Sequence, residues 1–134
     1  MLLYFHSMAA KSASPHTTYI VEHLDPELGP WSTLEYLAIA QESAEAGATF
    51  CLSSVPESLA LPSQLQEAQG LAVTHQGVEE KFASDKSRVC LLDPSAREEL
   101  SPEDGERFDA FLFGGILGKI LAGYLVVLRS EWLN

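Results

Sequence analysis

The chain has 134 residues and a formal net charge of -11, from 19 Asp and Glu side chains against 8 Lys and Arg. This length fits one domain with a sizeable core. The negative charge opposes binding to a phosphate backbone and favours a basic partner at low ionic strength, so nucleic acid is a poor candidate ligand. The only two cysteines, Cys51 and Cys90, each lie in an apolar run, which indicates buried thiols in a reducing compartment and no metal site built from cysteine.

The first 18 residues are expected to be neither a secretory signal nor a transit peptide, because their apolar run is very short and they lack arginine. We expect a disordered extension over residues 1–18, with Met8 as an alternative initiator. "YIVEH" (19–23) then predicts a strand, and "PELGP" (26–30) predicts a turn. After a helix, "ATFCLSS" (48–54) predicts a strand of a sheet that is covered on both faces.

The helix between these strands is predicted from its ends. Ser32 and Glu35 have the spacing of a capping box, and Trp31 is placed to staple onto Tyr36. Gly47 is placed to end the helix in a left-handed conformation. The residues expected on the apolar side are Leu34, Leu37, Ala38 and Ala44.

The same alternation continues along the chain. Ser63 and Gln66 predict a second capping box, Gly70 is expected to end that helix, and "LAVTH" (71–75) predicts a short strand. "RVCLLD" (88–93) predicts a buried strand that stops at a proline, which cannot donate to a ladder.

A last helical turn and strand complete the pattern. Ser101-Pro102 predicts the turn, with Glu103 and Asp104 favourable at its positive end, and "FDAFLFGG" (108–115) predicts the strand. Strands that alternate with short helices predict an α/β fold, with a mainly parallel sheet and helices on both faces.

Ligands in such sheets bind at the carboxyl ends of strands, which gives three candidate segments: 53–58, 92–96 and 114–118. In the last segment, Gly114, Gly115 and Gly118 would let backbone N–H groups approach a nucleotide-like ligand. A simple tight turn is the competing interpretation, because the segment lacks the spacing of a phosphate-binding fingerprint.

Other polar residues are weaker candidates. Glu22 and His23 are adjacent on one strand and point to opposite faces, so a capping or solvated role is favoured over an acid–base pair. The Ser53-Ser54 pair is interpreted as a hydrogen-bonding strand end, and Glu57 as a helix cap. Surface positions without metal-ligand spacing are expected for His6, His16, His75, Glu79, Glu80, Glu98 and Glu99.

Three strings, "YIVEHLDPELGPWSTLEY", "FCLSSVPES" and "SRVCLLDPSAREELSPEDGERFDAFLFGGILG", resemble in order and spacing the SPOUT-class protein arginine methyltransferases of fungi and their archaeal relatives. The resemblance runs from Tyr19 to Gly118. It implies a parallel α/β sheet whose C-terminal part threads a trefoil knot. It also implies a cytoplasmic enzyme that uses S-adenosylmethionine to methylate an arginine of the small-subunit ribosomal protein S-three, with no metal. The oligomeric state stays open.

The resemblance also implies a cofactor site made of two loops. Backbone groups of these loops would meet the adenine and ribose, and a carboxylate is the expected helper for the acceptor guanidinium. No catalytic residue is assigned, since the matching segment does not occur in this chain. The residues expected to bind the cofactor are Leu92, Asp93 and Pro94 in the first loop, and Gly114, Gly115, Ile116, Leu117 and Gly118 in the second.

After Gly118 the chain departs from the family and continues as "KILAGYLVVLRSEWLN". The third cofactor loop is missing, so we expect an incomplete knot and the following organisation: an extension over 1–18, a SPOUT-like methyltransferase domain over 19–118 and a divergent apolar tail over 119–134. Gly118-Lys119 can be encoded by a codon pair that contains a splice donor, which suggests a retained intron or a truncated gene model.

The tail leaves two alternatives of a different class. Residues 110–128 carry a single charge, Lys119, and have small residues at membrane-helix spacing, which would suit a tail-anchored membrane protein. However, the part outside the family match, "ILAGYLVVL", is too short to span a bilayer. The second alternative is a catalytically inactive, truncated binding module. A last strand or helix over the exposed sheet edge is the simpler expectation for the tail.

Overall fold

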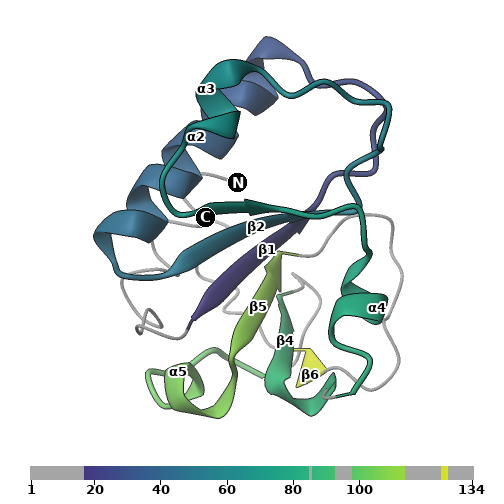
Figure 1. Cartoon of the computed structure of the whole chain (residues 1–134). Helices are drawn as coiled ribbons and strands as arrows, with labels where there is room; N and C mark the ends of the chain where they lie inside the picture. The colour runs from purple at the N-terminus through teal and green to yellow at the C-terminus, as the bar shows by residue number, and fades with distance from the viewer. Residues whose placement is uncertain (1–16, 85, 93–97, 114–124, 127–134) are drawn as a thin grey trace.

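The computed structural model describes residues 17–84, 86–92, 98–113 and 125–126. Within them the chain forms a six-stranded sheet in the order β3-β2-β1-β5-β4-β6, and every ladder is parallel (Figure 1). The strands are β1 (Thr18–Glu22), β2 (Thr49–Ser53), β3 (Leu71–Val73), β4 (Val89–Leu92), β5 (Ala110–Phe113) and β6 (Leu125–Val126). The helices are α2 (Pro30–Glu45), α3 (Ser63–Gln66), α4 (Val78–Lys81) and α5 (Asp104–Arg107), with a 3-10 turn at Lys86–Arg88.

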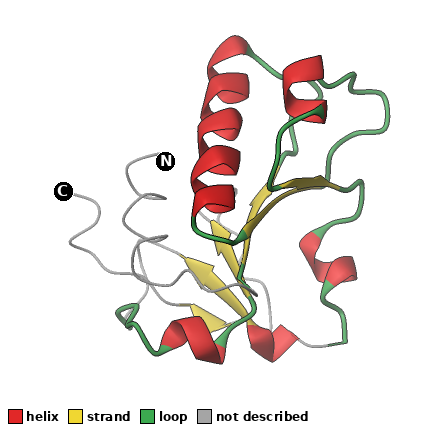
Figure 2. Cartoon of the chain, turned by 60° about the vertical axis from the view of Figure 1, so that its left-hand side comes forward, coloured by secondary structure: helices red, strands yellow, loops and turns green. Residues whose placement is uncertain are grey.

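Both faces of the sheet are buried, because side chains alternate along each strand. Tyr19 and Val21 of β1 join the larger apolar cluster, to which α2 contributes Tyr36. Ile20 joins the smaller cluster on the opposite face, to which α4 contributes Val78. Figure 2 shows α2 and α3 together on one side of the strands and α4 away from them. The predicted α/β fold with helices on both faces of a parallel sheet is therefore confirmed.

The start of α2 differs from the predicted one. The helix begins at Pro30, with Gly29 as an extended cap that accepts both the backbone N–H and the hydroxyl of Thr33. Proline suits the first helical position because its missing N–H would have no partner there. The predicted capping box was wrong, since Ser32 is already helical, and the staple was wrong, since the Trp31 side chain is 83% exposed.

The buried face of α2 also differs from the prediction. The side chains that turn inward follow the i, i+3, i+4, i+7 spacing of one helix face: Tyr36, Ile39, Ala40 and Ser43. Leu37 packs against this core as predicted and Ala38 is half-buried, but Leu34 and Ala44 are exposed. Gly47 follows the helix at φ +75, which confirms the left-handed ending.

The shorter helices agree only in part with the sequence predictions. Ser63 is the first residue of α3 and caps nothing, while the Gln66 amide donates to the Leu61 carbonyl, so the second capping box was wrong. Gly70 lies four residues beyond the end of α3, in the turn before β3, and so does not end the helix. Glu57 lies in a turn and starts no helix. The turn at Ser101 is confirmed, since the backbone N–H of Ser101 donates to Asp104 Oδ2 at 2.8 Å.

Both cysteines are buried, as predicted, and they lie on opposite faces of the sheet: Cys51 is in the smaller cluster and Cys90 in the larger one. At the other end of the chain, β6 pairs with β4 through Cys90 and Leu125, which confirms a strand at the sheet edge for two residues of the tail. The other residues of 119–134, and residues 1–16, lie outside the described residues. No helix in the described part is long and apolar enough to cross a membrane.

Gly70 combines positive φ with close packing, and this predicts a graded loss of stability. At φ +77, a Cβ on Gly70 would lie 3.0 Å from both the Ala40 carbonyl oxygen and the Ala44 Cβ, whereas at Gly47 it would meet nothing within 4 Å. We expect Gly47→Ala to lower the free energy of unfolding by about 1 kcal/mol, through backbone strain alone. Gly70→Ala should cost more, about 2–4 kcal/mol, because steric overlap adds to the strain. Urea denaturation measures both changes.

Gly29→Ala is the control for this pair, since Gly29 has negative φ and open space around the added carbon. Its effect should be within about 0.5 kcal/mol of zero. Equal losses for Gly47→Ala and Gly70→Ala would contradict the close approach of Gly70 to Ala40 and Ala44 of α2.

Candidate functional site

The carboxyl ends of the strands meet at one edge of the sheet, because all strands run in the same direction. Glu22 at the end of β1 is in register with Ser53 at the end of β2, and Leu92 at the end of β4 is in register with Phe113 at the end of β5. β5 pairs with β1 on its other side. The chain therefore enters all three predicted ligand segments from this one edge.

Of the predicted cofactor residues, only Leu92 lies within the described residues. Its side chain is 1% exposed and belongs to the larger apolar cluster, together with Phe113. Consequently Leu92 has only its main chain to offer to a ligand. The other predicted cofactor residues lie outside the described part of the chain: Asp93, Pro94, Gly114, Gly115, Ile116, Leu117 and Gly118.

Glu22 caps a helix that is distant in sequence. Its Oε1 accepts the backbone N–H of Val78 at 3.0 Å and the Ser54 hydroxyl at 3.3 Å. Val78 is the first residue of α4, whose own cap residue, Gly77, provides no side chain. The predicted capping role of Glu22 is therefore confirmed, and it joins the end of β1 to the face covered by α4.

Ser53 and Ser54 form the strand end that the sequence predicted. Ser54 has φ +55, in the left-handed region that non-glycine residues rarely adopt, and its backbone N–H donates to the Gln76 carbonyl at 2.9 Å. The Ser53 hydroxyl is fully buried and has no hydrogen-bond partner among the described residues. A non-glycine residue at positive φ beside a buried polar atom marks this as a constrained point of the edge.

His23 points to the opposite face from Glu22, so the two residues are not a pair, as predicted. Its Nε2 lies 2.9 Å from the Glu27 carbonyl oxygen and its Nδ1 lies 2.9 Å from the Tyr36 hydroxyl. Because a carbonyl only accepts, Nε2 carries a proton, and in the neutral tautomer with that proton Nδ1 accepts the hydrogen bond from Tyr36. The ring is 6% exposed, so this pair joins the end of β1 to α2 inside the core.

Tyr36 holds its phenolic proton tightly. Burial, followed by the charges of Glu35 and Asp25, raises the pKa of Tyr36 to about 12. Burial also raises the pKa of Tyr19. Both phenols are therefore neutral at physiological pH.

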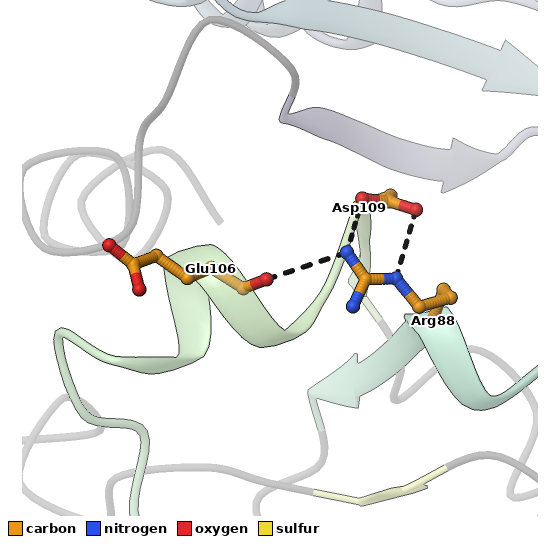
Figure 3. A network of polar contacts seen from close by, with 3 residues as sticks. All are labelled: Arg88, Glu106 and Asp109. Atoms are coloured by element: carbon orange, nitrogen blue, oxygen red, sulfur yellow. Dashed lines mark hydrogen bonds and ion pairs between the residues drawn. The ribbon is translucent and has the colours of Figure 1, made fainter.

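A polar network at the opposite edge of the sheet joins the starts of β4 and β5 (Figure 3). Arg88 donates to the two carboxylate oxygens of Asp109 at 3.1 and 2.7 Å, and to the Glu106 carbonyl oxygen at 3.4 Å. The Arg88 and Asp109 side chains are 39% and 53% exposed, so the pair contributes about 1 kcal/mol or less. It lies away from the carboxyl edge, and we interpret it as a structural link.

Within the described residues, no three His, Cys, Asp or Glu side chains lie close enough together to hold a metal ion. His75, Glu79, Glu80, Glu98 and Glu99 are exposed, as predicted. No local pattern in the sequence indicates the contacts of Glu22 with Val78 and of His23 with Tyr36, which join residues 56 and 13 positions apart. Only the fold brings these groups together.

Comparison with known proteins identifies a family and several relatives of this chain. A family described as "SFM1-like: Protein arginine N-methyltransferase SFM1-like" matches residues 18–121. The protein arginine N-methyltransferase SFM1 of Saccharomyces cerevisiae is 42% identical over 110 residues, which cover 75% of this chain and 50% of the relative. This chain therefore spans about half the length of the yeast relative.

Solved structures extend the comparison. Yeast SFM1 complexed with SAM has a TM-score of 0.60 at 40% identity, and covers 79% of this chain and 51% of the yeast chain. Yeast SFM1 complexed with MTA has a TM-score of 0.60 at 41% identity, over 76% and 56%. The dual-specific Trm10 of Thermococcus kodakaraensis, with a TM-score of 0.55 at 20% identity over 87% and 50%, shows the fold alone.

The parallel sheet and these structural relatives define a SPOUT-like α/β domain. More narrowly, the match over residues 18–121 places the chain in the SFM1-like protein arginine N-methyltransferase family. Both conclusions agree with the family and fold that the sequence resemblance implied.

The Glu22 cap predicts a loss of stability that depends on the acceptor atom. Glu22→Ala should lower the free energy of unfolding by about 1–3 kcal/mol, because it leaves the N–H of the buried Val78 without its acceptor. Glu22→Gln keeps an oxygen at the same place and should cost less than half as much. Urea denaturation compares the two, and Glu79→Ala on the exposed side of α4 is the control. A Glu22→Ala variant as stable as the control would exclude the capping role.

The raised pKa of Tyr36 predicts that the protein loses stability at high pH. The folded state keeps the Tyr36 proton up to about pH 12, whereas in the unfolded chain the proton leaves near the ordinary pKa of 10.0. The contribution of this phenol is therefore complete below pH 10 and is lost as the pH rises towards 12. The free energy of unfolding should fall less steeply over this range in Tyr36→Phe, which at neutral pH is about 1–3 kcal/mol less stable because His23 Nδ1 loses its donor. Parallel slopes would contradict the prediction.

Proposed function

We propose that this chain is an S-adenosylmethionine-dependent methyltransferase of the cytoplasm that acts on an arginine of the small-subunit ribosomal protein S-three. The observation that carries the proposal is the match of residues 18–121 to the SFM1-like family. The structure of yeast SFM1 complexed with SAM supports it, since it covers 79% of this chain. The substrate and the location rest on the resemblance of the sequence, and the acidic surface is suited to a basic protein rather than to RNA.

For the cofactor site, we propose the main chain of Leu92, Asp93 and Pro94 after β4, and the glycine-rich segment after β5. The geometry supports this pairing, because Leu92 and Phe113 are aligned at the end of neighbouring strands. With the Leu92 side chain buried, backbone groups are left to face a ligand, and glycines allow close approach. The second segment consists of Gly114, Gly115, Ile116, Leu117 and Gly118.

Bound there, S-adenosylmethionine would supply an electrophilic methyl group on its sulfonium. The protein has to hold the acceptor nitrogen in line with that methyl group and strip water from the guanidinium. Carboxylates at the acidic surface are suited to bind the guanidinium. We further propose that residues 19–118 form the methyltransferase domain, with 1–18 as an extension and 119–134 as a divergent tail.

A binding module without catalysis is a second candidate, favoured by one observation: the net charge of -11, which suits a basic partner. Such a module would keep the fold and the acidic surface and would not transfer a methyl group. Cofactor binding distinguishes the two functions.

Calorimetric titration of the purified chain with S-adenosylmethionine in detergent-free buffer tests the proposal. We expect micromolar binding, and transfer of labelled methyl to ribosomal protein S-three. Gly115→Val should weaken binding about tenfold or more by blocking close backbone approach, while Gly47→Ala, which lies before the start of β2 at the opposite edge of the sheet, should leave it unchanged. No binding by a folded, soluble chain would overturn the cofactor site and favour the binding module.

A further inference from the structure

The loop between β1 and α2 lies at the carboxyl edge of the sheet and makes few contacts of its own. Residues 24–27 are exposed, and Leu28 is half-buried against the larger apolar cluster. Figure 1 shows the loop running from the tip of β1 to the start of α2. In the part of the chain that the structure describes, residues 24–28 make a single hydrogen bond to the rest of the protein. In it, His23 Nε2 donates to the Glu27 carbonyl oxygen at 2.9 Å.

His23, by contrast, is held firmly in the core. Its backbone N–H donates to the Ser53 carbonyl at 2.8 Å, which continues the pairing of β1 with β2. Its ring is 6% exposed, and its Nδ1 lies 2.9 Å from the hydroxyl of the buried Tyr36. The two rings meet edge to face, with their centroids 5.7 Å apart. The histidine therefore belongs to the core, and only its outer nitrogen reaches the loop.

The loop is held much more weakly than the strand beside it. One neutral hydrogen bond adds little net stability, and a half-buried leucine adds less than a fully buried one. β1 is paired along both edges and buries side chains in both apolar clusters. At the far end of the loop, Gly29 has an extended backbone and open space around it. Segments with few buried contacts open at a lower free energy than the core, so this loop is suited to open by itself.

We propose that residues 24–28 form a strap over the carboxyl end of β1, and that the strap opens while the sheet stays folded when the His23–Glu27 hydrogen bond breaks. Leu28 and the His23 ring both pack on the α2 face, so the closed strap shields this end of the strand. Ligands of parallel α/β sheets bind at the carboxyl edge, and an opening strap there controls their access. The strap goes beyond the proposed function, since it requires neither cofactor nor methyl transfer.

Limited proteolysis with a glutamate-specific endoproteinase tests the strap, with mass spectrometry to identify the cleaved bonds. Glu27 is the only glutamate of the loop, whereas Glu42 lies within α2 and is cleaved only when the helix unfolds. When cleavage is slow relative to closing, its rate reports the population of the open form. In the wild-type chain we expect cleavage after Glu27 to be about tenfold or more faster than cleavage after Glu42.

Two substitutions of His23 separate its bond to the loop from its bond to the core. The amide nitrogen of His23→Gln is as many bonds from Cβ as Nε2 and can still donate to Glu27, whereas the shorter His23→Asn cannot reach it. Glu57, in an exposed turn, is the internal reference. Relative to cleavage there, cleavage after Glu27 should rise about tenfold in His23→Asn and less than about threefold in His23→Gln. Tyr36→Phe keeps the bond to Glu27 and should leave this ratio unchanged.

Three results would overturn the proposal. Cleavage after Glu27 as slow as after Glu42 in the wild type would mean that the loop opens only together with the helix. An unchanged ratio in His23→Asn would exclude the hydrogen bond as the latch. An equal rise in Tyr36→Phe would mean that the loop responds to a general loss of stability. Circular dichroism verifies that each variant is folded, and if His23→Asn is not, the comparison of Glu27 with Glu42 in the wild type still decides.

Discussion

The fold depends on β1, the strand that must satisfy hydrogen bonds on both edges and bury side chains on both faces. It pairs with β2 on one side and β5 on the other, and Tyr19, Ile20 and Val21 are all at most 3% exposed. Only a run of large apolar residues meets these conditions at once, because a polar side chain on either face would lack water and partners. Among the described strands, β1 lies between β2 and β3 on one side and β5, β4 and β6 on the other, and so joins the two parts of the sheet.

The end of β1 extends this role to the helices. Glu22 and His23 leave the strand on opposite faces, one to cap α4 and the other to bond with Tyr36 of α2. Both contacts are polar, partly or fully shielded from water and distant in sequence. Breaking either contact therefore costs free energy. Together the two contacts fix α4 and α2 relative to the carboxyl edge of the sheet. As predicted, Glu22 and His23 are not an acid–base pair, and their polar contacts join the helices on both faces to the end of β1.

The strands could be predicted from sequence, because a continuous apolar run such as "FCLSS" reflects burial that the chain carries locally. Helix boundaries could not. Ser32 and Glu35 have the spacing of a capping box, but Pro30 starts the helix earlier. The buried face of α2 was also predicted wrongly. The helix side that includes Leu34 is as apolar as the side that is buried, so the sequence alone does not indicate which side packs against the sheet. The strand ends of the candidate site follow from parallel topology, whereas the Glu22 cap depends on a residue 56 positions away.

Charge and chemistry are divided along the chain. Residues 17–80 hold β1, β2 and β3 with α2 and α3, and carry acidic but no Lys or Arg side chains. The described Lys and Arg residues begin at Lys81, and Arg88 with Asp109 links β4 to β5, the strands that lead into the proposed cofactor segments. Under the proposed function, a cationic substrate would be drawn to the first part while the cofactor is held by the second. Because β1 joins the two parts, its rigid pairing on both edges is what would keep the acceptor and the methyl group in a constant geometry.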